Sequence, residues 1–125
     1  MAKVTLKYVG NFQELGYDDQ PGAPSIHAAR GKRSLANKEK VVAYLRSATT
    51  FIVSPGRDED VFAPRQSAGS ASVMTDGTYV WPKTLAYYVE MYDVELPEEF
   101  EKHVQRLGWV APQTVDTSTV ELPRY

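Results

Sequence analysis

The sequence predicts an α+β fold in which a small, mainly antiparallel sheet has about three helices packed on one face. Two observations favour this class. Segments with the patterns of short strands occur near both ends of the 125-residue chain and in its middle, and segments with helical spacing separate them. The order shows no regular strand–helix–strand alternation, which is typical of α+β domains. An α/β arrangement is the alternative.

Two early segments have strand patterns. Residues 4–9 alternate between apolar and mostly polar side chains, as a half-buried strand does. Residues 49–53 are β-branched or aromatic and are followed by Pro55 and Gly56, which indicates a short buried strand that ends in a turn. Residues 58–62 fit either a strand or one helical turn.

The clearest local signal is a hairpin. Residues 72–75 and 78–80 flank Asp76 and Gly77, a dipeptide that accepts the positive φ angles of a type I′ turn. We therefore expect two antiparallel strands joined by a two-residue loop. One further strand is expected at 119–122.

Three helices are expected, the first two over 37–47 and 82–92. Asn37 is a suitable N-cap for the first helix, and Pro82 fits the first turn of the second because its missing N–H is not needed there.

The third helix is expected over 97–107, with Pro97 in its first turn and Gly108 at its end. Glu98 and Glu99 face the positive end of its dipole. Its buried stripe is expected to consist of Leu96, Phe100, Val104 and Leu107.

The chain length fits one domain, with residues 1–109 as its core and 110–125 as an irregular C-terminal segment. Turn-forming residues crowd 16–31 and predict a long loop. The chain has no cysteine, and lysines interrupt its N-terminal apolar residues, so we expect no disulfide, signal peptide or membrane span. We therefore expect a cytoplasmic protein with no membrane partner.

Charge is distributed unevenly along the chain. Residues 30–46 hold six basic residues and one acidic residue, whereas residues 90–101 hold six acidic residues and no basic one. Solvated helix faces explain most such runs, but they also steer charged partners. Nucleic-acid binders usually carry a strong positive charge, and this chain has a net charge of -2 and a pI near 5.7, so we expect no nucleic-acid partner.

Signatures of catalysis, metal binding or cofactor binding are absent from the sequence. His27 and His103, the two histidines, lie in no metal-ligand or HxxE pattern and are expected to have structural or surface roles. No glycine-rich phosphate loop is present, and no serine of segment 66–72 lies in a GxSxG elbow. We therefore expect no catalytic residue, no metal and no cofactor.

A longer stretch carries a resemblance. Residues 75–104 read TDGTYVWPKTLAYYVEMYDVELPEEFEKHV. This stretch resembles a group of small, largely uncharacterised bacterial proteins that pair DGxxVWPxxLAYYV with LPxEF. The loop at 22–32 and the VVAYLRS segment at 41–47 are similar too, so the likeness covers residues 15–109. Some members look like immunity proteins carried beside secreted polymorphic toxins, which implies a binder of a cognate protein toxin and no enzyme.

An immunity protein covers a toxin site that is often cationic, so acidic and aromatic side chains suit its binding surface. A general interaction or adaptor module is one alternative. A small enzyme or ligand-binding protein built on the loop at 16–33 and segment 66–72 is another. The residues expected to bind the partner are Tyr87, Glu90, Tyr92, Asp93, Glu95, Glu98 and Glu99.

Overall fold

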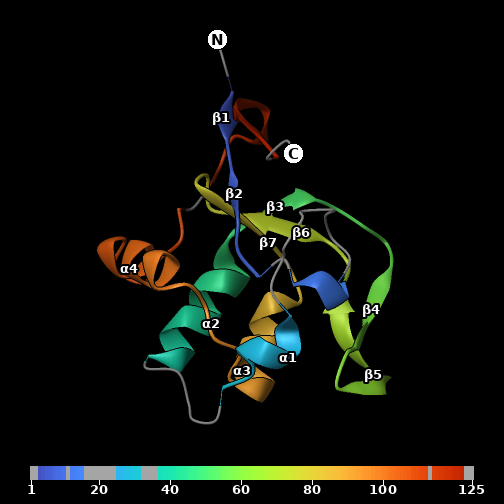
Figure 1. Ribbon diagram of the computed structural model, residues 1–125. Helices are drawn as coiled ribbons and strands as arrows, with labels where there is room; N and C mark the ends of the chain where they lie inside the picture. Colours follow the sequence, from blue (N-terminus) through green and yellow to red (C-terminus); the bar gives the residue numbers. More distant parts are fainter. Residues whose placement is uncertain (1–2, 11, 16–24, 32–36, 113, 123–125) are drawn as a thin grey trace.

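The structure is a computed structural model that describes residues 3–10, 12–15, 25–31, 37–112 and 114–122. It confirms the α+β class: helices gather on one side of a central sheet, while two short strand pairs extend from its borders (Figure 1). Residues 16–24 of the expected long loop, and residues 32–36 of the basic segment, lie outside the described residues.

The central sheet has four strands in the order β2-β7-β6-β3. Strand β6 pairs antiparallel with both β3 and β7, whereas β2 runs parallel to β7. The sheet is therefore mixed but mainly antiparallel. The strands are β2 (Lys7–Tyr8), β3 (Thr49–Ile52), β6 (Val73–Thr75) and β7 (Tyr79–Pro82).

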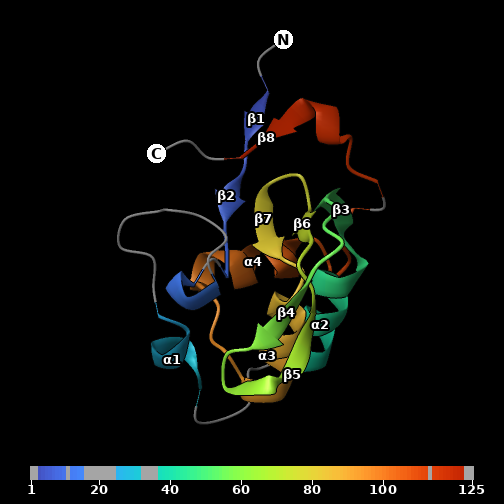
Figure 2. The same ribbon diagram turned by 90° about the vertical axis from the view of Figure 1, so that its right-hand side faces the viewer.

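Two further strand pairs extend the fold. β1 (Val4–Thr5) runs parallel to β8 (Val120–Glu121), and this pair lies at the opposite end of the molecule from α3 (Figures 1 and 2). β4 (Arg57–Asp60) forms an antiparallel hairpin with β5 (Ala63–Ser70). The expected strand near residue 120 is therefore present, and residues 58–60 belong to a strand.

The described residues contain four α-helices and two 3₁₀ turns. The 3₁₀ turns are Gln13–Leu15 and Thr117–Thr119. The α-helices are α1 (Ile26–Ala29), α2 (Lys38–Ser47), α3 (Leu85–Tyr92) and α4 (Glu98–Arg106).

The sheet separates two groups of buried side chains, because neighbouring residues of a strand point to opposite faces. On the helix side, Trp81 of β7 and Phe100 of α4 are fully buried with ring centroids 5.8 Å apart. On the other side, Val80 packs with Leu6 and Val120. The larger cluster lies between the sheet and the helices, as expected for helices on one face.

The hairpin is confirmed, but its loop is shifted by one residue. The backbone N–H of Asp76 donates to the carbonyl of Tyr79, so Gly77 and Thr78 are the central residues. Of these two, only Gly77 has a positive φ, at 92°, which fits a type II′ turn. The expected type I′ turn is wrong because the Asp76 side chain binds the loop N–H groups of Thr78 and Tyr79 and fixes Asp76 before the loop.

Three details of the expected helices are wrong. Pro82 ends strand β7, where it pairs with Val73, and α3 begins only at Leu85. Asn37 has left-handed backbone angles and makes no side-chain cap. Leu107 is 41% exposed, because α4 ends at Arg106 and the chain turns away before Leu107 can continue the buried stripe.

Three strand or loop expectations also change. The expected buried strand at 49–53 is the edge strand β3, whose side chains are half-buried except for the exposed Ile52, because the strand has a neighbour on one side only. Strand β5 was missed, since Pro64 and Gly69 weaken its strand pattern. Within the expected loop at 16–31, the described part contains the short helix α1, which Ser25 caps by accepting the N–H of His27.

Candidate functional site

The structure divides the seven expected partner-binding residues among four places. Tyr87 and Tyr92 reach from α3 toward the β4–β5 hairpin. Glu90 and Asp93 face α2, and Glu98 and Glu99 begin α4. Glu95 lies exposed in the linker between α3 and α4.

Both tyrosines bind one buried carboxylate. The hydroxyl groups of Tyr87 and Tyr92 donate to Oδ2 of Asp60 over 2.5 and 2.6 Å, and the backbone N–H groups of Phe62 and Ala63 donate to its Oδ1. Burial raises the pKa of Asp60, but these hydrogen bonds outweigh it and hold the pKa below its usual value. The tyrosine hydroxyls therefore serve the fold, and only the half-buried rings remain for a partner.

The basic and acidic runs of the sequence neutralise each other where α2 packs on α3. Lys38 Nζ lies 2.9 Å from Asp93 Oδ1, and Arg46 donates to Glu90 over 2.8 Å. A groove of about 570 Å³ lies along this seam, and its charged lining residues balance. This seam therefore presents little net charge to a partner. The lining consists of Lys38, Glu39, Val42, Ala43, Arg46 and Glu90.

The acidic side chains of α4 are only partly neutralised. Glu98 pairs with Lys102 one turn away, and Glu99 pairs with Lys7 of β2. Both pairs are exposed, and exposed pairs contribute little energy. Glu95 forms no ion pair with any residue that the structure describes.

A second groove, of about 250 Å³, lies between α2 and α4 beside these carboxylates. Its floor is apolar, because Val41 and the half-buried ring of Trp109 line it. Polar and charged side chains form the rest of the lining. They are Asn37, Glu98, Glu101, Lys102 and Gln105.

Glu101 occupies an unfavourable position in this groove. Burial raises the pKa of its half-buried carboxyl, and the negative charges of Glu98 and Glu95 raise it further. The ionised carboxylate therefore lacks sufficient compensation in the free protein. A cation placed in the groove would supply it.

Trp109 reaches the groove through an unusual backbone conformation. Its φ is 67°, a left-handed value that costs a residue with a side chain about 1 kcal/mol. Gly108 shares this conformation with a φ of 68° and ends α4. The Nζ of Lys40 lies 5.6 Å from the centroid of the indole ring, so the ring already contacts one cation.

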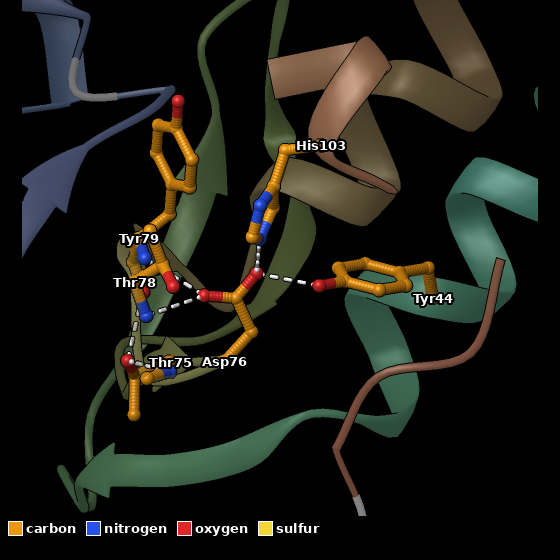
Figure 3. Close-up of polar contacts among 7 residues, drawn as sticks. Tyr44, Thr75, Asp76, Thr78, Tyr79 and His103 are labelled. Carbon is orange, nitrogen blue, oxygen red and sulfur yellow. Dashed lines mark hydrogen bonds and ion pairs between the residues drawn. The ribbon is translucent and has the colours of Figure 1, made fainter. Parts of the chain in front are cut away.

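A third polar cluster holds the hairpin to two helices (Figure 3). The Oδ1 of Asp76 accepts the N–H groups of Thr78 and Tyr79. Its Oδ2 accepts the hydroxyl of Tyr44 from α2 over 2.5 Å and lies 2.9 Å from Nε2 of His103 on α4. Burial and this bond raise the pKa of Tyr44. These contacts join the hairpin to α2 through Tyr44 and to α4 through His103. They give His103 a structural role.

In the part of the chain that the structure describes, the serines of segment 66–72 bond partners other than a histidine or a carboxylate. The hydroxyls of Ser70 and Ser72 lie 2.9 Å apart and bond each other, and Arg57 donates to the hydroxyl of Ser67. Among the described residues, no three His, Asp or Glu side chains are placed to share a metal ion. Within the same residues, no helix has the length and apolar character needed to cross a membrane.

None of the comparisons with family models, curated proteins and solved structures finds a match. The α2–α4 groove and the sequence resemblance are therefore the observations that bear on function.

Three residues of these sites were missed from the sequence. Trp109 follows Gly108, the residue expected to end the third helix, and no pattern around it indicates a groove. Glu101 is one charge of the acidic run at 90–101, and Asp60 lies in the segment 58–62, which fits either a strand or one helical turn. A signal for Glu101 was available, because residues 98 and 101 are neighbours on a helix and two carboxylates there repel.

Proposed function

We propose that this chain is a non-enzymatic protein-binding domain that neutralises a cognate bacterial toxin, as immunity proteins do. The groove between α2 and α4 is the proposed contact for a basic part of that toxin. The observation that carries this choice is the uncompensated carboxylate of Glu101, next to Glu98 and Glu95, on the wall of a groove lined by Trp109.

This combination suits a basic protein partner. Complementary charge speeds encounter, and an aromatic side chain that becomes buried slows dissociation. The left-handed backbone of Trp109 and the repulsion of the Glu101 carboxylate by its acidic neighbours both lower the stability of the free protein. Unfavourable features of this kind are common at functional sites. The resemblance of residues 15–109 to small proteins carried beside toxins supports the same class of partner. The proposal places the protein in the cytoplasm, where such a toxin would act.

Co-expression tests this function. The gene that neighbours this one and encodes a toxin domain is expressed in a bacterial host with or without the wild-type chain. The proposal expects growth to be restored and the two purified proteins to form a complex. A toxin that still kills, and that does not bind the chain in solution, would leave an adaptor role as the remaining interpretation.

Replacing Glu101 with glutamine is expected to stabilise the free protein at neutral pH and to weaken toxin binding. The folded pKa is raised, so the ionised form opposes folding at pH values above it. This gain in stability should disappear as the pH falls through the pKa of Glu101 in the folded protein toward its pKa in the unfolded chain. Thermal unfolding at several pH values measures the gain.

Glu99→Gln is the matched control, because Glu99 lies in the same first turn but is exposed, pairs with Lys7 and does not raise the pKa of Glu101. This change removes a favourable charge from the helix start and should not stabilise the fold. Equal effects of the two substitutions on the unfolding temperature would show that Glu101 is not under electrostatic strain.

A further inference from the structure

An aromatic cage lies on the other side of α3 and is occupied by an arginine of the same chain. The guanidinium carbon of Arg30 lies 4.8 Å from the ring centroid of Phe62 and 4.9 Å from that of Tyr92. These two rings are 4.5 Å apart and inclined at 48°. Two ring faces that converge on one cation form the arrangement by which proteins recognise cationic groups.

One ring of the cage is joined to a carboxylate, because the hydroxyl of Tyr92 donates to Asp60. Asp60 is 0% exposed and is held by Tyr92 and Tyr87 through their hydroxyls and by the N–H groups of the β4–β5 turn. Because these four donors occupy both carboxylate oxygens, Asp60 attracts a cation through its charge without bonding to it directly. The four donors stabilise this charge within the fold, and its negative sign adds to the preference of the two ring faces for a cation over a neutral group.

Within the part of the chain that the structure describes, the rings of Phe62 and Tyr92 are the contacts recorded for the guanidinium group of Arg30. Arg30 is exposed, and its guanidinium has no carboxylate partner among the described residues. Exchange of this side chain for another cation would therefore cost no ion pair.

The backbone around Arg30 is fixed by other contacts. Ile26 is buried in the core, and its N–H donates to the carboxylate of Glu14 over 2.7 Å. Next to Arg30, Gly31 donates to the carbonyl of Asp93, and Ala29 accepts the N–H of Glu95. The Arg30 side chain can therefore leave the cage while α1 stays in place.

We propose that the cage of Phe62 and Tyr92 binds the guanidinium group of an arginine presented by another protein, and that Arg30 occupies it in the free chain. This site lies on α3 and the β4–β5 hairpin and is separate from the α2–α4 groove. It does not depend on the identity of the partner as a toxin.

The test removes the Arg30 side chain from the cage and adds a small guanidinium compound in its place. Methylguanidinium is titrated into the wild-type protein and into Arg30→Ala, and the ring signals of Phe62 and Tyr92 are followed by NMR. The variant should bind the probe with saturation and at least about fivefold more tightly than the wild type, because Arg30 no longer competes. Arg30→Gln, which keeps the first three side-chain carbons but has no charge, should behave in the same way and guards against misfolding of the alanine variant.

Two controls decide whether the cage is the site and whether it takes an arginine. Arg30→Ala combined with Phe62→Leu keeps an apolar side chain but removes one ring face, and it should lose the saturable shift. The tripeptide Gly-Arg-Gly with blocked ends should bind to Arg30→Ala more tightly than Gly-Lys-Gly does. Equal binding of methylguanidinium to wild type and variants, or no preference for the arginine peptide, would overturn the proposal.

Discussion

Replacing Phe100 with alanine is expected to lower the free energy of unfolding by about 3–5 kcal/mol. The Phe100 ring is 0% exposed and fills the space between the sheet and two helices. It meets the ring of Tyr79 at 5.0 Å, that of Trp81 at 5.8 Å and that of Tyr44 at 6.3 Å between centroids. Such a tightly surrounded site cannot collapse to fill the cavity, so the loss should lie at the upper end of this range. Urea unfolding measures it.

Leu107→Ala, just past the end of the same helix, is the matched control. Leu107 was expected in the same buried stripe but is 41% exposed just beyond the end of α4. Its truncation should cost less than about 1 kcal/mol, because little apolar surface returns to water. Similar losses for both variants would mean that the orientation of α4 is wrong.

Replacing Asp76 with alanine is the second large effect, with an expected loss of about 3 kcal/mol or more. The change leaves two loop N–H groups, the buried hydroxyl of Tyr44 and the ring of His103 without their acceptor. Removing one member of a buried, hydrogen-bonded group costs the desolvation of all its partners. Thermal and urea unfolding at neutral pH measure the loss.

Variants of Tyr44 and His103 show how much of the stability lost in Asp76→Ala belongs to each partner. Tyr44→Phe and His103→Gln each remove or weaken one bond to Asp76, and each should cost about 1–2 kcal/mol. In the Asp76→Ala background the same two changes should cost much less, since the shared acceptor is gone. Full additivity would indicate that the cluster does not act as a unit.

Helical spacing predicted the buried face of α4 because periodicity is a local property of the sequence. Phe100 and Val104 are buried as expected. The same spacing failed at Leu107, because the position at which a helix ends depends on backbone conformation at Gly108 and Trp109, both left-handed here. The pattern of side chains could not distinguish a continuing helix from one that had just ended.

The turn dipeptide located the hairpin but not its register. Gly77 does supply the positive φ, while Asp76 acts through its carboxylate and not through its backbone angles. Its partners Tyr44 and His103 come from α2 and α4, about 30 residues away on either side. No local pattern indicates such contacts.

The same limit applies to the candidate site. The opposite charge runs at 30–46 and 90–101 were visible in the sequence, but their pairing through Lys38 with Asp93 and Arg46 with Glu90 depends on the packing of α2 on α3. What remains available to a partner is the set of carboxylates that this packing leaves uncompensated. That set is centred on Glu101, which only the structure places in a groove.

The most direct measurement compares two neutralised pairs in binding to the cognate toxin. Glu98→Gln with Glu101→Gln removes two negative charges from the groove. Glu39→Gln with Glu59→Gln removes two exposed negative charges that do not line the α2–α4 groove and changes the net charge equally. If the groove is the contact, the first pair should raise the dissociation constant at least about tenfold and the second should change it little. Equal effects of the two pairs, or no effect of the groove pair, would contradict the assignment of the groove as the partner-binding site.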